Sequence, residues 1–522
     1  MKNITKGFPG IIANDNVTFE LRKGEIHALL GENGAGKSTL MSILFGMYAP
    51  DSGQIYKNGE PVSILSPNDA NDLGIGMVHQ HFKLVEVFSV LDNIILGVET
   101  TKRGMISRKE VEKDILELCQ RYELQVDPNA LIENISVGMQ QRTEILKMLY
   151  RENDILIFDE PTAVLTPQEI NQLMITMKNL AAEGKSIIFI THKLDEIVAV
   201  CDRVTVLRRG KLVKTLNVSE TNKEELSYYM IGRDVDFTLH KEESVIGDNV
   251  LLVKDLNVVD MLTNKHVLTD VSFKVNKGEI VCLAGIDGNG QTELGYAISG
   301  ILKPQSGSIY LNYIDVTKKS IRFRNDNGMS HIPEDRHRYG LILQENLANN
   351  LSLKKYHLKP YQKYGLIQQD EIDKLGKRLV EEFDIRSGRG IKTLAGSMSG
   401  GNQQKAIIAR EIDKDADFIL AIQTVRGLDV GAVEFAHRKL IEQRDKGKGI
   451  LMISLDLDEV FSVSDRVLVI YEGHIVKDVL TKDITVNELG LYMSGVKKDV
   501  IPPVEFSDEE LKIIEERSER YD

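Results

Sequence analysis

The sequence predicts an α/β protein made of two tandem copies of one domain, each built around a mostly parallel sheet. Short apolar runs bounded by glycine and charged residues are typical of buried strands, and helical patterns lie between them. Strands that alternate with helices favour a parallel sheet. The chain also repeats itself, and its 522 residues are long enough for two domains with cores of their own.

The elements of the first copy follow from these patterns. The runs that predict buried strands lie at residues 26–30, 155–158, 187–190 and 204–207. A capping box of Ser107 and Glu110 introduces a helix with one apolar face, formed by Val111, Ile115, Leu118 and Tyr122. Residues 250–253 predict a first strand in the second copy, and we expect the first copy to lack most of that strand.

Matched segments establish the duplication. Residues 23–26 recur at 277–280, and residues 50–56 recur in similar form at 304–310, both at an offset of 254. Further on, residues 202–204 recur at 465–467, which is an offset of 263. The second copy has therefore gained nine residues between positions 334 and 399. We expect a first domain at 1–235, a linker at 236–248, a second domain at 249–498 and a charged tail at 499–522.

Composition indicates an ordinary globular protein and excludes several other classes. Hydrophobic residues make up 42% and charged residues 27% of the chain, which excludes a disordered or fibrous protein. The longest apolar runs fall far short of the ~20 residues that a membrane span needs, and residues 1–25 do not resemble a secretory signal. Cys119, Cys201 and Cys282 stand alone, so we expect reduced thiols. The net charge of −13 argues against nucleic acid as a partner.

A phosphate-binding loop is predicted directly after the strand at 26–30. Its residues satisfy the pattern G-x-x-x-x-G-K-[ST] and precede a helical run: Gly31, Glu32, Asn33, Gly34, Ala35, Gly36, Lys37, Ser38 and Thr39. Glycines let the backbone wrap phosphates so that successive N–H groups face the anion. We expect Lys37 to reach the β- and γ-phosphates of a nucleotide and Ser38 to bind Mg²⁺.

Two carboxylates, Asp159 and Glu160, follow the predicted strand at 155–158. Paired acids after a strand are by themselves more often a solvated turn. Beside a phosphate loop, however, a strand end is where a metal-holding Asp and a water-orienting Glu are needed. The two patterns together therefore favour a catalytic role for this pair.

Further motifs give the chain a resemblance to ABC-type ATPases over nearly its whole length, twice. They are the phosphate loop, Gln80 in Val-His-Gln, the run Ser-Val-Gly-Met-Gln-Gln-Arg at 136–142, and His192 after a threonine. The chain resembles the ATP-binding subunits of bacterial importers for simple sugars and nucleosides, which fuse two nucleotide-binding domains. It is most similar to the nucleoside branch. The resemblance implies P-loop ATPase domains, each with a helical subdomain.

The same resemblance implies roles for residues of the first copy. Phe8 would stack on the adenine of ATP, Glu160 would polarise the attacking water, and His192 would contact the γ-phosphate. Gln80 would sense Mg²⁺ and the attacking water while it touches the membrane partner. The ligands of Mg²⁺ would be Ser38, Gln80 and Asp159. A place in the core remains the alternative for Phe8.

For the whole chain, the resemblance implies an ATPase that couples hydrolysis of ATP to solute import. Its partners would be two integral-membrane permease subunits and an extracellular substrate-binding protein, with one chain per transporter at the cytoplasmic face of the membrane. A pentose or hexose is the alternative cargo to a nucleoside. A soluble tandem ABC factor acting on ribosomes is a further alternative, although that branch usually has two competent sites and a long basic segment between its domains.

The second copy differs where chemistry is expected. The counterparts of Lys37, Gln80, Asp159, Glu160 and His192 are Gln291, Glu334, Ile422, Gln423 and Leu455. Loss of the phosphate-reaching cation, the metal holder and the base predicts a degenerate site. The backbone N–H groups from Gly288 to Thr292 remain, so a bound nucleotide and an empty site are both open.

The signature segments differ in the opposite sense. The second copy has paired glycines that let a backbone approach a γ-phosphate closely, within Ser399, Gly400, Gly401, Asn402 and Gln403. The first copy has Val137 and Met139 at two of the matching positions, where side chains hinder that approach. In ABC proteins each nucleotide lies between the phosphate loop of one domain and the signature of the other. The resemblance therefore implies one competent and one impaired site.

Overall fold

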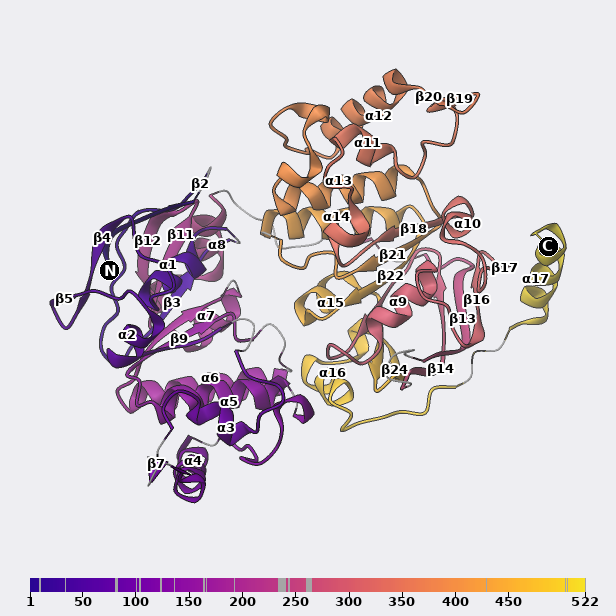
Figure 1. Cartoon of the computed structure of the whole chain (residues 1–522). Coiled ribbons are helices and arrows are strands. Elements are labelled where there is room, and N and C mark those ends of the chain that lie inside the picture. The colour runs from indigo at the N-terminus through magenta and orange to yellow at the C-terminus, as the bar shows by residue number, and fades with distance from the viewer. Residues whose placement is uncertain are drawn as a thin grey trace. The chain divides into compact units, whose positions relative to one another are not determined.

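The computed structural model divides into two compact units, Met1–Val235 and Asp236–Asp522 (Figure 1). Residues 241–248 of the predicted linker and the tail beyond 498 belong to the second unit where they are described. The structure describes residues 1–8, 11–32, 34–79, 83–99, 101–102, 105–122, 124–135, 137–162, 165, 167–191, 193–232, 241–242, 245–259, 265–428, 430–502, 504 and 506–521.

Unit 1 contains two main sheets. Its strands are β1 (Lys2–Phe8), β2 (Ile11–Val17), β3 (Ile26–Leu30), β4 (Ser52–Lys57), β5 (Glu60–Val62), β6 (Ile75–Val78), β7 (Thr101–Lys102), β8 (Met105–Ile106), β9 (Ile155–Asp159), β10 (Ser186–Ile190), β11 (Arg203–Arg208) and β12 (Lys211–Asn217). The first sheet is antiparallel in the order β2-β1-β4-β5, and the second has the order β12-β11-β3-β10-β9-β6. The second sheet is parallel except for β12, which confirms the predicted mostly parallel core.

The helices of unit 1 include a group inserted between β6 and β9. They are α1 (Lys37–Leu44), α2 (Pro67–Asp72), α3 (Val90–Ile95), α4 (Arg108–Tyr122), α5 (Val137–Tyr150), α6 (Pro167–Ala182), α7 (Leu194–Val200) and α8 (Lys223–Ile231). Figure 1 shows α3, α4 and α5 gathered away from β4 and β5, as a helical subdomain. Helix α4 follows a hydrogen bond between Ser107 and Glu110 of 3.0 Å, as its capping box predicted.

Unit 2 repeats this architecture. Its strands are β13 (Asn249–Val259), β14 (His266–Asn276), β15 (Ile280–Ala284), β16 (Ser306–Leu311), β17 (Ile314–Asp315), β18 (Met329–Ile332), β19 (Gln362–Lys363), β20 (Leu366–Ile367), β21 (Phe418–Ile422), β22 (Gly449–Ser454), β23 (Arg466–Tyr471) and β24 (His474–Leu480). The sheet orders are β14-β13-β16-β17 and β18-β21-β22-β15-β23-β24. Strand for strand, these orders match those of unit 1, so the duplication seen in the sequence is a duplication of the fold.

The helices of unit 2 match those of unit 1 and add one at the C-terminal end. They are α9 (Gln291–Ser299), α10 (Ile321–Asp326), α11 (Leu347–Ser352), α12 (Gln369–Glu382), α13 (Gly400–Asp413), α14 (Val430–Asp445), α15 (Leu457–Val463), α16 (Val486–Met493) and α17 (Asp508–Tyr521). A π-helical turn, η3 (Arg336–Gly340), follows Glu334. The Val85 amide donates to Asn93 Oδ1 in unit 1, and the Ile342 amide donates to Asn350 Oδ1 in unit 2. These equivalent bonds align Val85 with Ile342, so three of the nine inserted residues lie between Glu334 and Ile342, at this turn.

The first strand of unit 1 is present, although it is shorter than its counterpart. Strand β1 has 7 residues and β13 has 11. Ile4 pairs with Val17 in the first unit as Leu256 pairs with Val271 in the second. The expectation that the first copy lacks most of this strand therefore holds only for the part that would match residues 249–253.

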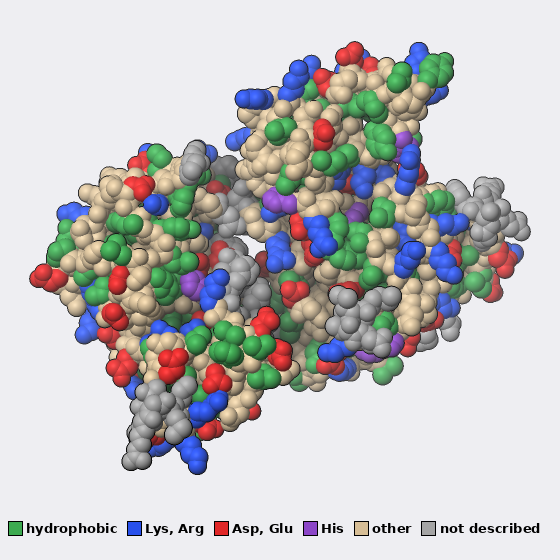
Figure 2. Space-filling view, viewed as in Figure 1, with side chains coloured by type: hydrophobic (Ala, Val, Ile, Leu, Met, Phe, Trp, Pro, Cys, Tyr) green, Lys and Arg blue, Asp and Glu red, His purple; other side chains and the backbone are tan. Residues whose placement is uncertain are grey.

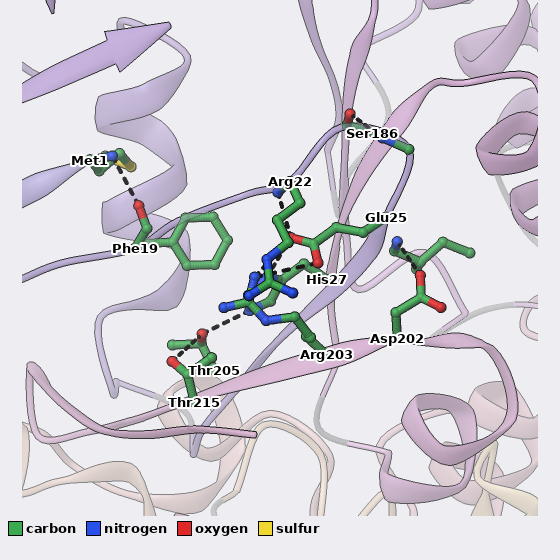
Figure 3. Close-up of polar contacts among 12 residues, drawn as sticks. Met1, Phe19, Arg22, Glu25, His27, Ser186, Asp202, Arg203, Thr205 and Thr215 are labelled. Atoms are coloured by element: carbon green, nitrogen blue, oxygen red, sulfur yellow. Dashed lines mark hydrogen bonds and ion pairs between the residues drawn. The ribbon is translucent and has the colours of Figure 1, made fainter. Parts of the chain in front are cut away.

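A buried polar network fixes one end of the parallel sheet in unit 1 (Figure 3). The Glu25 carboxylate accepts hydrogen bonds from the Arg22 amide and lies 3.2 Å from both His27 Nδ1 and the Arg203 guanidinium. Thr205 lies 2.8 Å from His27 Nε2. Burial favours the neutral form of Glu25, but these partners outweigh it and hold the pKa of the carboxyl below its usual range.

Unit 2 keeps the ion pair of this network and loses its histidine. Glu279 pairs with Arg466 at 3.0 Å, while Val281 stands where unit 1 has His27. In each unit an aspartate also accepts a hydrogen bond of 2.9 Å from the first amide of the central strand. These contacts lie at the end of the sheet opposite the phosphate loop, so the two copies share their scaffold there.

The tail folds back on unit 2 instead of standing apart. Glu510 of α17 hydrogen-bonds the Asn249 side chain and pairs with Lys274 at 3.2 Å. Phe506 packs edge-on against Tyr310 with ring centroids 5.4 Å apart. Figure 1 shows α17 beside β17. The predicted tail is thus a helix that packs against the antiparallel sheet of this unit.

Two expectations about chain class can be compared with the described residues. Cys119, Cys201 and Cys282 are buried and free of disulfides, as the sequence predicted. None of the described helices is both long and apolar enough to cross a membrane.

Candidate nucleotide-binding sites

The loop between β3 and α1 has the backbone shape that its glycines predicted. Gly36 has a φ of +99°, and a Cβ there would lie 2.2 Å from the Ala13 carbonyl oxygen. The buried Asn14 side chain donates a hydrogen bond of 3.1 Å to the Gly36 carbonyl. A Cβ on Gly31 would meet Leu207 O at 2.5 Å. Glycine is therefore required at both positions on steric grounds.

Lys37 begins α1 and lies almost wholly buried in this loop. Its ammonium donates hydrogen bonds to the carbonyls of Gly31 at 2.6 Å and Glu32 at 3.1 Å. Burial lowers the pKa of Lys37, and the charges of Glu160, Asp159 and Glu32 oppose that shift. The first N–H groups of α1 have no partner within the helix. A cation and backbone donors thus converge on one loop.

The acidic pair lies at the end of β9. The Ser38 hydroxyl hydrogen-bonds Asp159, whose pKa rises to about 6 because the carboxyl is buried and lies near the charge of Glu160. Glu160 has a φ of +48°, and its amide donates a 3.0 Å hydrogen bond to Ile190 O. This unusual backbone conformation turns the strand end sharply after the acid pair.

The residues of unit 1 fit a magnesium nucleotide. Mg²⁺ takes oxygen ligands, usually one or two from protein with substrate phosphates and water, and Ser38 and Asp159 already lie in contact. The pKa of the Asp159 carboxyl stays raised although Lys37 acts to lower it, which is typical of a site that receives further positive charge. The described part of the loop also leaves open space at Gly34, where a Cβ would meet nothing within 4 Å.

Several residues predicted for this site lie at its edge or outside the described residues. Ala35 is buried, and Thr39 is half-buried in the first turn of α1. Phe8 is 37% exposed and packs edge-on against Tyr48, with centroids 5.4 Å apart. The core alternative for Phe8 is therefore wrong, and the ring is accessible. Asn33, Gln80 and His192 lie outside the described residues.

The second loop is filled by its own glutamine. Gln291, at the position of Lys37, is 4% exposed. Its Nε2 donates a hydrogen bond of 2.9 Å to Ile286 O, and its Oε1 accepts one of 3.1 Å from the Asn289 amide. Among the backbone N–H groups from Gly288 to Thr292, that of Asn289 therefore already has a partner within the loop.

Glu334 closes the same region with a set of hydrogen bonds. Its carboxylate accepts from Tyr296 Oη at 2.9 Å, Thr292 Oγ1 at 3.3 Å and Gln423 Nε2 at 3.4 Å. Burial, and then the bond to Glu334, raises the pKa of Tyr296. The hydroxyl of Thr292, which matches the serine predicted to bind Mg²⁺, is thus bound to the Glu334 carboxylate.

The remaining substituted positions of unit 2 are Ile422, Gln423 and Leu455. Ile422 is fully buried in the core, and its Cδ1 lies 2.5 Å from where a Cβ on Gly295 would stand. Leu455 is half-buried. Gln423 has a φ of +43°, close to that of Glu160. The backbone of the acidic pair is therefore preserved in unit 2 although its carboxylates are gone.

The signature segment of unit 2 forms the start of α13. Ser399 occupies the N-cap position without a capping hydrogen bond from its side chain, and it is exposed. Gly400 and Gly401 are half-buried, and Asn402 Nδ2 donates to Ser399 Oγ at 2.8 Å. Gln403 donates to Ala395 O at 2.9 Å and lies 3.0 Å from His337 Nε2.

Each signature has a charged neighbour, and the two charges are opposite. In unit 2 the Arg336 guanidinium of η3 donates to Gly400 O at 3.4 Å. In unit 1 a Cβ on Gly138 would lie 2.0 Å from Glu169 Oε1, so the carboxylate covers the first turn of α5. Met139 is 39% exposed there. A phosphate would meet a cation at one signature and an anion at the other.

Sequence reasoning missed Tyr296, Glu169 and Arg336. Tyr296 lies four residues after Thr292 on α9, so helical spacing could have placed both on one face. Glu169 has Ala432 as its counterpart, and that difference in charge between copies was a usable signal. Arg336 lies in the insertion after Glu334, where the two copies do not align.

Comparisons with known proteins agree with this architecture. The family model described as ABC transporter matches residues 14–163 and again 268–421. The chain is 53% identical over 495 residues to the guanosine import ATP-binding protein NupO of Bacillus subtilis, covering 95% of this chain and 97% of the relative. The nucleoside import ATP-binding protein NupA of Lactococcus lactis has the same identity and coverage.

Among solved structures, the chain is similar along its length to the archaeal ribosome recycling factor aABCE1, crystallised with the ribosomal stalk protein aP1. The TM-score is 0.59 at 18% identity, with 99% of this chain and 98% of the other covered. At that identity the likeness extends to the tandem fold alone.

Proposed function

Since this chain belongs to the family of ABC transporter ATP-binding proteins, we propose that it drives the import of a nucleoside. It is an ATPase, as members of the family are. The observation that carries the cargo class is 53% identity over 495 residues to two proteins named for guanosine and nucleoside import. The ribosomal alternative is weaker, because the structural neighbour aABCE1 is 18% identical and shares the fold alone.

We further propose that hydrolysis takes place at the nucleotide site of unit 1 alone. Lys37 is placed in the loop by two carbonyls and would move to the phosphates when they bind. Glu160 would orient and polarise the attacking water, and Ser38 with Asp159 would hold Mg²⁺. When bound, Mg²⁺ offsets phosphate charge and takes a share of the charge that develops on hydrolysis. Gln80 and His192 keep the roles that the resemblance implies.

The region of unit 2 that matches this site is proposed to stay empty of nucleotide. Support comes from Gln291, which occupies the Asn289 amide, and from Glu334, whose charge would repel a polyphosphate. Unit 2 contributes its intact signature, Ser399 to Gln403, to the competent nucleotide. This follows the family scheme in which loop and signature come from different domains.

The proposed setting is the cytoplasmic face of the cell membrane. Import ATP-binding subunits are peripheral there, and we propose two permease subunits and an extracellular substrate-binding protein as partners. One chain carries both nucleotide-binding domains, so one chain per transporter is expected. Closure on ATP and reopening after hydrolysis would gate the permease, so the cargo itself need not touch this chain.

The test is uptake of labelled guanosine, uridine, ribose and galactose by cells whose only copy carries Lys37→Ala. Loss of nucleoside uptake alone is expected, because Lys37 is the phosphate-reaching cation of the competent site. Gln291→Ala is the matched control and should transport normally. Loss of sugar uptake alone would keep the energy-coupling role and overturn the cargo. Normal uptake of nucleosides by Lys37→Ala cells would contradict the proposal.

A further inference from the structure

The segment between α11 and α12 of unit 2 has an unusual composition. Residues 353–368 contain four lysines and three tyrosines, and no acidic residue occurs from Asn346 to Gln369. The rest of the chain is acidic overall, with a net charge of −13. The matching segment of unit 1, residues 96–107, is four residues shorter and carries Glu99 with two basic residues. Part of the insertion in the second copy therefore built a basic, aromatic segment.

This segment ends in a hairpin whose apolar residues face solvent. Strands β19 and β20 are joined by Tyr364 and Gly365, which have φ values of +54° and +80°, as a tight primed turn requires. Tyr364 is 94% exposed, Leu366 71% and Ile367 48%. The same end of unit 2 carries hydrophobic and basic side chains side by side in Figure 2.

The base of this exposed segment is anchored to the rest of unit 2. Tyr361 packs against the core of the helical subdomain, and the Gln368 amide donates to Tyr361 O at 2.8 Å. Lys355 pairs with Asp413 at 2.7 Å. The base of the segment is therefore fixed, and it presents Lys359, Lys363 and the apolar tip outward.

A basic cavity of about 470 Å³ lies at the foot of this hairpin. Lys354, Tyr356 and His357 of the segment line it, together with Arg322, Arg338 and Arg410 from other elements. Two carboxylates offset part of this charge: Asp326 lies 3.4 Å from His357 and 3.7 Å from Arg322, and Glu411 pairs with Arg410 at 2.9 Å. Lys354 and Arg338 therefore leave the cavity with an excess of positive charge.

We propose that the segment 353–368 docks on the anionic phospholipid surface of the membrane. Tyrosine and leucine side chains are suited to the boundary between headgroups and acyl chains. Lysines beside them are attracted to anionic headgroups, and the cavity can receive a headgroup phosphate. The rest of the chain would be repelled by such a surface, so the segment would also select the face of unit 2 that approaches it. The proposal rests on the proposed function only for the presence of a membrane nearby.

Vesicle sedimentation with the purified full chain tests the proposal. The chain should pellet with vesicles rich in phosphatidylglycerol and stay in solution with phosphatidylcholine alone, and salt should weaken binding. Lys359→Glu with Lys363→Glu should lower the affinity at least roughly tenfold. Tyr364→Ser with Leu366→Ser should also lower it, leaving a remainder that salt removes.

The matched control is Lys446→Glu with Lys482→Glu, which makes the same charge change at exposed positions elsewhere on unit 2. It should bind vesicles as the unaltered chain does. Turnover of ATP in solution should be the same for all three variants, which shows that they are folded. The proposal is overturned if the chain ignores phosphatidylglycerol, binds both vesicles equally, or binds unchanged after the hairpin substitutions. Vesicle binding is measured without transport, so this proposal and the proposed nucleoside import can fail independently of one another.

Discussion

The two units keep the same scaffold and differ at one end of it. At the end of the sheet opposite the loop, Glu25 with Arg203 and Glu279 with Arg466 form the same buried ion pair. At the loop end, Lys37 reaches two carbonyls, whereas Gln291 is bonded into its own loop. Contacts that hold the fold were preserved, while contacts at the loop proposed to bind phosphate diverged.

The difference is more than a loss of the groups proposed for catalysis. In unit 2 the vacated positions have acquired partners of their own, since Glu334 is bonded to Tyr296, Thr292 and Gln423. A buried carboxylate without partners would be costly. The degenerate region is thus a repacked polar cluster, and predictions that exchange features between units can test whether that cluster matters.

The largest expected effect is on ATP turnover, and it comes from substituting the residue that follows the acidic strand in each unit. Glu160→Gln removes the group proposed to polarise water and should lower ATP turnover by ~10²–10³. Gln423→Ala changes the matching position of unit 2 and should leave turnover near the unaltered rate. Steady-state phosphate release from the purified chain measures both. Equal losses in the two variants would contradict a single competent site.

A second experiment attempts to reverse the divergence. Gln291→Lys with Glu334→Gln frees the Asn289 amide and removes the charge that opposes polyphosphate. The double variant should bind a second equivalent of Mg-ATP, measured by equilibrium dialysis, where the unaltered chain binds one. Turnover should not rise, because Ile422 and Gln423 still lack carboxylates. If the unaltered chain already binds two equivalents, the proposal of an empty second region is wrong.

The elements of both units could be predicted from sequence, but the repacked cluster could not. The apolar runs at 26–30 and 187–190 became β3 and β10 within one residue, because burial on both faces leaves a plain hydrophobic signal. The phosphate loop is equally local, since its glycines answer steric demands of their own backbone. These features are encoded within short stretches.

Partnerships across the chain carry no such local signal. Gln291 marks a lost lysine in the sequence, but only the fold shows that its side chain bonds the Asn289 amide. Glu334 and Tyr296 lie 38 residues apart, and their bond depends on how β18 and α9 pack. The charges beside the signatures, Glu169 and Arg336, were hidden for the same reason.

The carboxyl of Asp159 should make the stability of unit 1 depend on pH, whereas unit 2 has no such group at the matching position. Its pKa of about 6 is above the usual value near 3.8, so the folded chain holds the proton more tightly than the unfolded chain does. The stabilisation is therefore complete below about pH 4 and is lost as pH rises through 6. Two pKa units correspond to at most about 3 kcal/mol.

Asp159→Asn removes this dependence and should make metal-free unit 1 more stable than the unaltered unit at pH 7, with the gain vanishing toward pH 4. Thermal unfolding in chelator at several pH values measures it. Unit 2 already has Ile422 at this position and provides an internal reference. A variant that follows the unaltered chain at every pH would show that the carboxyl is not strained by burial.

The smallest effect concerns the charges beside the signatures. Arg336 contacts Gly400 of the intact signature, and loss of a charged hydrogen-bond partner of phosphate costs about 1.5–3 kcal/mol. Because the contact of Arg336 is long, at 3.4 Å, the lower end of that range applies, and Arg336→Ala should lower turnover about tenfold. Glu169→Ala changes the charge beside the other signature and should leave turnover unaltered, because no hydrolysis depends on it. Arg336→Lys should restore part of the rate, since it keeps the charge but not the planar guanidinium. If Glu169→Ala slowed turnover as much as Arg336→Ala did, both signatures would contribute to hydrolysis, and the asymmetry between the units would be structural only.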